Sequence, residues 1–404
     1  MACDAAGDGR ISLIRISEGA SVCGVREAAH KLGNEVGKGS CVLARQSNAV
    51  DFWRGFALIT IFINHVPGIY FERFTYKNLS ISDSADLFVF LAGWALRLVA
   101  GPPENPTPTL TLMARVGRRS LTIYAAHILI MSIAIAMLAA AARALDNPLL
   151  LEWNNAAAVF YDPVNTHIGL VLLTHQLGYF DILPLYVVLM LVAPLIVLIH
   201  RQAPNWLFAL SLTIYLATLI FRIQIQSWPG EGQWFFNPLA WQFVFVLGFQ
   251  MARVRGVGGF VRCHIFWIRL VALPIILVAA VAVAVGFWPD ATKVPEPKLL
   301  FLLSKTYATP IRLIQFLALV AVFSAVYPYL QKWMRPLVDF LSRLGRNSLN
   351  VFCVGSVLSL AGQILRFVFR GSLSVDILIA VVGIGLLFAT AWLSEWQLPS
   401  KGSS

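Results

Sequence analysis

Long apolar stretches follow one another along the chain from about residue 50, and short polar segments separate them. A transmembrane helix needs about 20 predominantly apolar residues, and about ten of these stretches come close to that length. They lie at about residues 52–70, 85–100, 121–145, 177–200, 205–221, 235–252, 266–288, 311–330, 347–370 and 375–393. The pattern therefore predicts an all-α, polytopic membrane bundle of about ten transmembrane helices.

The two ends of the chain differ from this apolar region. Residues 1–50 contain Gly, Ser and mixed charges, and they lack the apolar core that is typical of a signal peptide. We expect three parts: a flexible cytosolic N-terminal extension over 1–50, the membrane domain over 51–395, and a short cytosolic tail over 396–404.

The composition excludes a water-soluble enzyme. Of the 404 residues, 58% are hydrophobic and 13% are charged, whereas an ordinary soluble domain has about 25% charged residues. The mean hydropathy is +0.73. The five cysteines have no paired spacing, so neither a metal site nor a disulfide framework is indicated.

The net charge of +11 has an explanation other than nucleic-acid binding. Counted from Lys31 onward, the tails and loops on the side of the N-terminus carry 15 Lys and Arg residues, against 8 on the opposite side. Positive residues gather on the cytosolic side of membrane proteins. We therefore expect both termini to lie in the cytosol. We expect the lipid bilayer to be a partner and nucleic acid not to be one.

Three ionisable residues lie in the first predicted span, whose sequence is DFWRGFALITIFINH: Asp51, Arg54 and His65. Eleven helical residues turn about 1100°, so Arg54 and His65 share one face and lie about 16 Å apart along the axis. Ionisable groups inside a bilayer are costly, and imidazole is well suited to act as a base near neutral pH. A snorkelling Arg and a His bonded to a neighbouring helix are the structural alternatives.

Two further charged groups lie near the predicted span ends. Asp83 and Asp86 begin the second span, where either can orient His65 or cap the helix. Arg115, Arg118 and Arg119 precede the third span and suit phosphate groups, although they can equally serve membrane topology.

Two predicted external loops are rich in aromatic and amide side chains. The first covers residues 146–176 and includes Trp153 and Asn154. The second covers 222–241 and includes Trp228, Trp234, Asn237 and Trp241. Aromatic faces beside amides can stack on sugar rings and bond their hydroxyls, but an aromatic belt at the membrane surface has the same composition.

Several of these segments are similar to known membrane acyltransferases. DFWRGFALITIFINH and ADLFVFLAGW resemble motifs of the membrane acyltransferase family 3 superfamily. FDILPLYVVLMLVAPLI (180–196), WPGEGQWFFNPLAWQFVFVLGF (228–249) and LGRNSLNVFCVGSVLSL (344–360) resemble the OpgC family more specifically. The similarity covers about residues 48–395. The last spans depart from the superfamily pattern, since they lack an obvious His or Glu partner for the base.

The resemblance implies a multi-pass enzyme of the bacterial inner membrane that succinylates osmoregulated periplasmic glucans from cytosolic succinyl-CoA. It also implies that activity depends on Arg54 and His65. We expect His65 to act as the base, supported by Asp86 or Asp83. The donor-binding group is expected to comprise Arg54, Asp51, Arg115, Arg118 and Arg119, and the acceptor-binding group Trp228, Trp234, Asn237 and Trp241.

This hypothesis leaves several points open. The thioester donor requires no metal and no bound cofactor, and acyl-CoA is a co-substrate. The distal succinyl carboxylate needs a cation, for which Arg222, Arg312 and Arg366 are candidates. Direct transfer and an acyl-enzyme intermediate both remain open. So do an O-acetyltransferase acting on another surface polysaccharide and, from another class, a glucan transporter.

Overall fold

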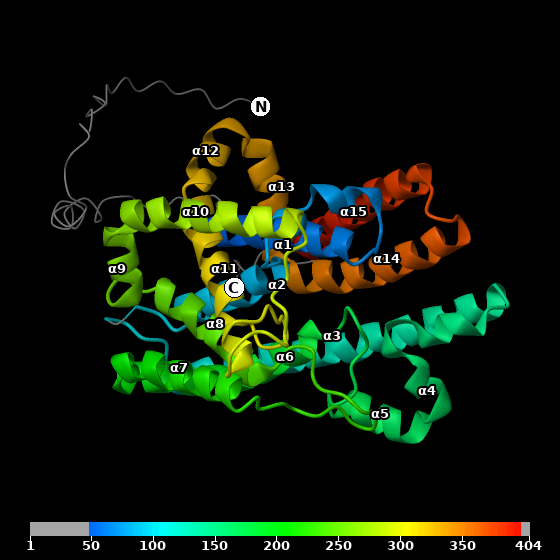
Figure 1. Ribbon diagram of the computed structural model, residues 1–404, viewed down its shortest axis with the longest axis horizontal. Coiled ribbons are helices and arrows are strands. Elements are labelled where there is room, and N and C mark those ends of the chain that lie inside the picture. Colours follow the sequence, from blue (N-terminus) through cyan, green and yellow to red (C-terminus); the bar gives the residue numbers. More distant parts are fainter. Residues whose placement is uncertain (1–47, 103, 397–404) are drawn as a thin grey trace, which may run out of the picture. The chain divides into compact units, whose positions relative to one another are not determined.

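The computed structural model describes residues 48–102 and 104–396, and helices form most of this part (Figure 1). The α-helices are α1 (Ala49–Asn64), α2 (Ser84–Val99), α3 (Thr109–Ala144), α4 (Ala157–Tyr161), α5 (Pro163–Val171), α6 (Ile182–Gln202), α7 (Pro204–Ile220), α8 (Pro238–Met251), α9 (Val257–Cys263), α10 (Ile265–Ala284), α11 (Pro310–Phe323), α12 (Val326–Trp333), α13 (Arg335–Arg346), α14 (Ser348–Val368) and α15 (Leu373–Trp396). Short 3-10 helices are η1 (Tyr70–Phe74), η2 (Tyr76–Leu79), η3 (Pro148–Asn155) and η4 (Lys298–Leu300). Residues 1–47 of the predicted extension and 397–404 of the predicted tail lie outside the described residues, whereas residues 49 and 50 already belong to α1.

The all-α prediction is confirmed for the described residues, which form helices and no strand. The β-structure in this part is limited to an isolated bridge between Gln226 and Gln233. Each of the ten predicted segments contains a helix. Five helices, α3, α6, α10, α14 and α15, are long and apolar enough to cross a membrane. The pair α11 and α12, bent by 42°, makes a sixth if it forms one broken span. Since α1, α2, α7 and α8 are shorter, the count of ten spans is not confirmed.

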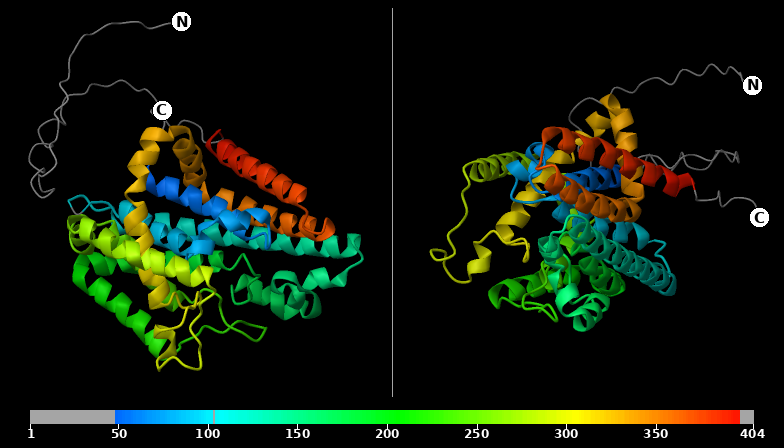
Figure 2. Two further views of the ribbon diagram at one scale, coloured as in Figure 1. Left: turned by 45° about the horizontal axis from the view of Figure 1, so that its top comes forward. Right: turned by 90° about the vertical axis from the view of Figure 1, so that its right-hand side faces the viewer.

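Helices α1 and α2 lie in the middle of the assembly. Figure 2 shows them in blue, with α14 and α15 in orange and red on one side and α3 on the other. Helix α1 packs against α13 and α14, whereas α2 packs against α8 and α3 packs against α6. The first two predicted spans are therefore surrounded by protein, which places their polar side chains where neighbouring helices can supply partners.

Glycines let the central helices approach closely. A Cβ atom at Gly93 of α2 would lie 1.8 Å from a backbone carbonyl oxygen of α8, and one at Gly248 of α8 would lie 1.9 Å from a carbonyl of α2. Gly55 of α1 and Gly345 of α13 meet the partner backbone in the same reciprocal way. Small residues at helix crossings are the usual means of tight packing in membranes. These two crossings fix α1 and α2 in the bundle.

Replacing Gly93 with alanine is expected to destabilise the protein, because the added methyl group meets backbone that cannot rotate away. Overpacking typically costs about 1–3 kcal/mol and sometimes more. The melting temperature of the purified protein in detergent measures the effect. Gly385→Ala in α15 is the matched control, since no atom lies within 4 Å of its Cβ position. Equal melting temperatures for the two variants would contradict the proposed close crossing.

Candidate active site

Two cavities lie near opposite ends of α1. Arg54, in the second turn of α1, lines a cavity of about 470 Å³. His65, which directly follows α1, lines another of about 380 Å³. Phe352 of α14 lines both, so this residue borders the two cavities. The two residues predicted to share one face, Arg54 and His65, thus line two separate cavities.

The first chamber, called here the arginine cavity, is lined by five arginines: Arg54, Arg115, Arg118, Arg119 and Arg346. Arg54 donates a hydrogen bond to the Leu91 carbonyl at 2.9 Å, which anchors its guanidinium between α1 and α2. The side chains of Arg115, Arg118 and Arg119 are exposed and have no hydrogen-bond or ion-pair partner in the described part of the chain. The arginines expected at the donor site therefore lie together, and Arg115, Arg118 and Arg119 face the cavity without a partner in the described part of the chain.

Two residues alter the predicted donor group. Asp51 does not line the arginine cavity; it is 3% exposed, and its carboxylate accepts a hydrogen bond from Asn48 at 2.8 Å. It therefore belongs to the beginning of α1 rather than to a ligand site. Arg346 was missed, although it lies within the 344–360 segment that carries the family resemblance. Its Nε atom lies 2.9 Å from Glu395.

The second chamber, the histidine cavity, surrounds His65. The His65 ring packs against Tyr179, with centroids 4.8 Å apart. Its Nδ1 atom is buried and has no hydrogen-bond partner among the described residues. Buried polar atoms in native proteins nearly always have a hydrogen-bond partner. An unpartnered ring nitrogen beside a cavity therefore indicates that a ligand can form a hydrogen bond with it. Two lysines and two aspartates also line this cavity: Lys77, Asp83, Asp181 and Lys305.

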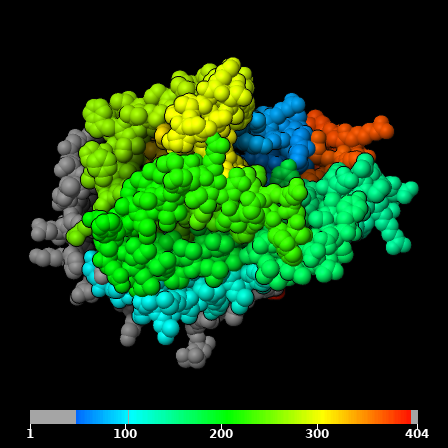
Figure 3. Space-filling model, turned by 60° about the horizontal axis from the view of Figure 1, so that its bottom comes forward, coloured from blue at the N-terminus to red at the C-terminus, as the bar shows by residue number. Residues whose placement is uncertain are grey.

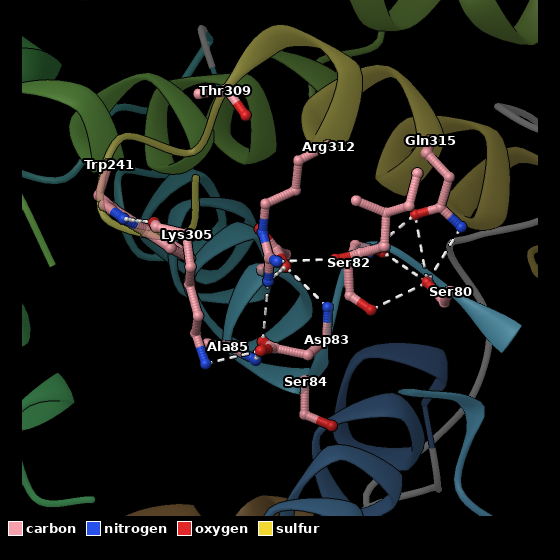
Figure 4. A network of polar contacts seen from close by, with 12 residues as sticks. Ser80, Ser82, Asp83, Ser84, Ala85, Trp241, Lys305, Thr309, Arg312 and Gln315 are labelled. Atoms are coloured by element: carbon pink, nitrogen blue, oxygen red, sulfur yellow. Dashed lines mark hydrogen bonds and ion pairs between the residues drawn. The ribbon is translucent and has the colours of Figure 1, made fainter. Parts of the chain in front are cut away.

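Asp83 and Lys305 form an ion pair in the wall of the histidine cavity. The Lys305 Nζ atom lies 2.6 Å from Asp83, and the Arg312 guanidinium lies 3.2 Å from the same carboxylate (Figure 4). Burial disfavours the charged carboxylate, but these two cations outweigh that effect and hold the pKa of Asp83 below its usual range. These cations therefore favour the ionised form of Asp83, which also caps α2. Figure 3 shows one face of the molecule, on which the yellow segment around residue 300 lies next to the blue segment around residue 70.

Asp86 has a structural contact instead of the predicted support role. It is 1% exposed, does not line the histidine cavity, and pairs through both oxygens with Arg312. It also completes a capping box with Asp83 at the beginning of α2. Neither carboxylate forms a hydrogen bond with His65 among the described residues. The expectation of a carboxylate that directly orients the imidazole is not met, because Arg312 and Lys305 occupy both acids.

None of the four predicted acceptor residues lines this cavity. Trp228 is 43% exposed in a loop, whereas Trp234, Asn237 and Trp241 are 6%, 2% and 0% exposed. Asn237 caps α8, and the Trp241 indole donates to the Lys305 carbonyl at 3.0 Å. These buried side chains hold the loops together and cannot offer a face to a sugar. The neighbouring Phe235 and Phe236 line the histidine cavity instead.

The three cations expected near a succinyl carboxylate are all engaged elsewhere. Arg222 pairs with Glu296 at 2.7 Å, Arg312 with Asp83 and Asp86, and Arg366 with Asp376.

Four residues of the histidine cavity were not predicted from the sequence: Tyr179, Asp181, Lys77 and Lys305. Asp181 could have been found, since it lies near the beginning of the 180–196 segment. Lys305 carries no comparable signal. In the described part of the chain, no three His, Cys, Asp or Glu side chains are grouped to hold a metal ion.

Comparison with known proteins places these cavities in a family context. A family model described as OpgC protein matches residues 45–398. The match covers every described helix and the residues of both cavities. Searches of curated proteins and of solved structures gave no match.

Proposed function

The chain belongs to the OpgC family, and on this premise we propose that it transfers succinyl groups from cytosolic succinyl-CoA to hydroxyls of periplasmic glucans. Family membership and the apolar helices identify a membrane-bound acyltransferase that modifies glucans. We further propose that the enzyme lies in the bacterial inner membrane, that its donor is succinyl-CoA and that its acceptor is a glucan in the periplasm.

The observation that carries the proposal is the division of one α1 stripe between two chambers. Arg54 lies in a cavity with four other arginines, His65 lies in a cavity with acids and aromatic rings, and Phe352 is common to both. An enzyme that joins a cytosolic donor to an acceptor outside needs an anion site and a base at different depths. A transporter of neutral glucan has no comparable need for an arginine cluster separated from a histidine.

The arginine cavity suits the phosphate groups of CoA. Guanidinium groups bind phosphates in a bidentate manner, and Arg115, Arg118 and Arg119 have all their donors available. Phe88 and Tyr186 add apolar surface, with Phe88 packed 6.2 Å from Phe352 between ring centroids. In the proposed mode of binding, the phosphates stay with the arginines while the thioester reaches past Phe352 toward His65.

The proposed step is direct acyl transfer in the histidine cavity. His65 takes the proton from a glucan hydroxyl, and the oxygen attacks the thioester carbonyl carbon. The carbon–sulfur bond then breaks, and the thiolate leaves and takes the proton from the imidazolium. Asp83, held ionised by Lys305 and Arg312, supplies negative charge to the same cavity while His65 is positive.

Neutralising the donor arginines is expected to weaken the use of succinyl-CoA. The combined variant Arg115→Gln, Arg118→Gln and Arg119→Gln removes three exposed guanidiniums from the cavity wall. Hydrogen bonds to charged groups contribute about 1.5–3 kcal/mol each, so KM for the donor should rise at least about tenfold. KM for glucan should change little. Arg143→Gln, at the other end of α3, is the matched control. A donor KM equal to that of the parent would refute this assignment.

Lys305 is proposed to recognise the distal carboxylate of the succinyl group. Lys77 and Lys305 are the cations that line the histidine cavity in the described part of the chain. An ammonium has three N–H donors, so Lys305 can bind Asp83 and still donate to a second carboxylate.

Lys305→Gln should therefore lower the preference for succinyl-CoA over acetyl-CoA by about tenfold or more, since a charged hydrogen bond is lost. The ratio of kcat/KM for the two donors measures this preference. Lys298→Gln tests the effect of losing a lysine from the same loop, because Lys298 pairs with Glu296 and does not line the cavity. An unchanged ratio in the Lys305 variant would show that another group reads the acyl chain.

The proposed function is tested by supplying purified protein with glucan and either succinyl-CoA or acetyl-CoA. Release of free thiol and appearance of an ester on the glucan should both require the succinyl donor. Glucan from cells with the protein should also be more anionic than glucan from cells without it. Preferential acetylation would favour the O-acetyltransferase alternative. Movement of glucan across the membrane without release of free thiol would favour a transporter.

A further inference from the structure

A third cleft, of about 430 Å³, adjoins the histidine cavity, and Tyr179 lines both. We infer that this cleft binds a neutral hexose unit of the acceptor and presents one hydroxyl to His65. The inference rests on the proposed function for the identity of the acceptor. Besides Tyr179, the cleft is lined by Trp153, Asn154, Gln363, Arg366 and Phe367.

Aromatic rings provide one wall of this cleft. Trp153, from η3, meets Phe367 of α14 edge to face with centroids 5.6 Å apart. Phe367 is 45% exposed, and Trp153 and Tyr179 are partly exposed. Rings in this state can cover the apolar face of a sugar while the hydroxyls point elsewhere.

Amide groups provide the polar wall. The Gln363 side chain donates to the His65 carbonyl at 2.7 Å, which fixes the orientation of its amide. Asn154, in a left-handed backbone conformation with φ of 55°, lies across from Gln363, with 3.5 Å between the two amides. Each amide group can form more hydrogen bonds than these contacts use. The remaining donors and acceptors suit the hydroxyls of a sugar.

The charge of the cleft favours a neutral ligand. Arg366 forms an ion pair with Asp376, and the other Asp376 oxygen accepts a hydrogen bond from the Tyr70 backbone N–H at 2.7 Å. The guanidinium is therefore compensated by a carboxylate that is itself held in place. A phosphate or other anion would find no uncompensated cation among the described lining residues.

Two contacts join the cleft to the proposed base. Tyr179 packs on the His65 ring, and Gln363 bonds the His65 backbone. A hexose held between Trp153 and the amides therefore lies beside Tyr179, the residue that borders both spaces, and one of its hydroxyls can point past this ring into the histidine cavity. This arrangement would select which hydroxyl of the sugar unit reaches the imidazole.

Calorimetric titration of the purified full-length chain with neutral glucan oligosaccharides tests the inference. Trp153→Ala should weaken binding at least tenfold, and Phe367→Ala should weaken it by a similar or smaller factor. Phe367 is exposed, so its replacement is informative even if the Trp153 variant fails to fold. Trp288→Ala, which removes a tryptophan 61% exposed and outside this cleft, should bind as the parent does.

Kinetic measurements separate this inference from the proposed function. In an active enzyme, Trp153→Ala should raise KM for glucan without changing KM for succinyl-CoA. Parental binding by both Trp153→Ala and Phe367→Ala, or no glucan binding by the parent, would overturn the inference. If glucan binding depends on these residues but the parent protein transfers no succinyl group, the inference of a sugar site is supported and the proposed function is wrong.

Discussion

Replacing His65 with alanine is expected to lower the rate of succinyl transfer by about 10² to 10⁴, the usual cost of losing a general base. His65 lines the cavity in which the proposed transfer occurs, and the Nδ1 atom of its ring lacks a protein partner among the described residues. No other histidine lines that cavity in the described part of the chain. Initial rates of ester formation at saturating donor measure the effect.

The His65 variant needs evidence that it remains folded. The Nδ1 atom of its ring has no hydrogen-bond partner among the described residues, so the melting temperature should stay close to that of the parent. His167→Ala, at an exposed position in α5, should retain the parental rate. Near-parental transfer by a folded His65→Ala protein would show that the imidazole is not the base.

Arg312→Met is expected to lower the free energy of unfolding by about 3–5 kcal/mol, the range measured when one partner of a buried ion pair is removed. Arg312 is 7% exposed, pairs with Asp83 and Asp86, and donates to the Ile81 carbonyl at 2.7 Å (Figure 4). Methionine leaves the two carboxylates close together without this cation. The melting temperature and the yield of monodisperse protein should both fall.

A double variant separates loss of the ion pair from loss of packing. Combining Arg312→Met with Asp86→Leu removes the buried carboxylate together with its cation, and such apolar replacements are often nearly neutral. The capping box is lost as well, at a cost of about 1 kcal/mol. The double variant should therefore melt above the single Arg312→Met variant. If it melts no higher, unpaired charge is not the cause of the destabilisation.

The α1 stripe could be predicted because helical periodicity alone sets the angle between Arg54 and His65. The arginines of α3 could also be placed at one level, since they occupy neighbouring turns of a single helix. In both cases the relevant geometry is local in sequence. The structure adds that α3 and α1 contribute to the same cavity.

The loop residues could not be assigned in this way, because their surroundings depend on distant segments. Trp241 is buried because its indole finds the carbonyl of Lys305, 64 residues away. Asp86 is withdrawn from His65 by Arg312, 226 residues away. Composition marks two loops as rich in aromatic and amide side chains, but only the tertiary fold distinguishes the buried Trp241 from Trp153, which lines a cleft.

The central claim is that donor and acceptor reach α1 from opposite faces of the membrane. It is tested with protein reconstituted in vesicles in one known orientation, with succinyl-CoA only on the side of the arginine cavity and glucan only on the other. The proposal predicts free CoA on the donor side and succinyl ester on glucan that never left its own side. Movement of unmodified glucan without CoA release would contradict the acyltransferase assignment, and ester formation only when both substrates share a face would contradict transfer between the two chambers.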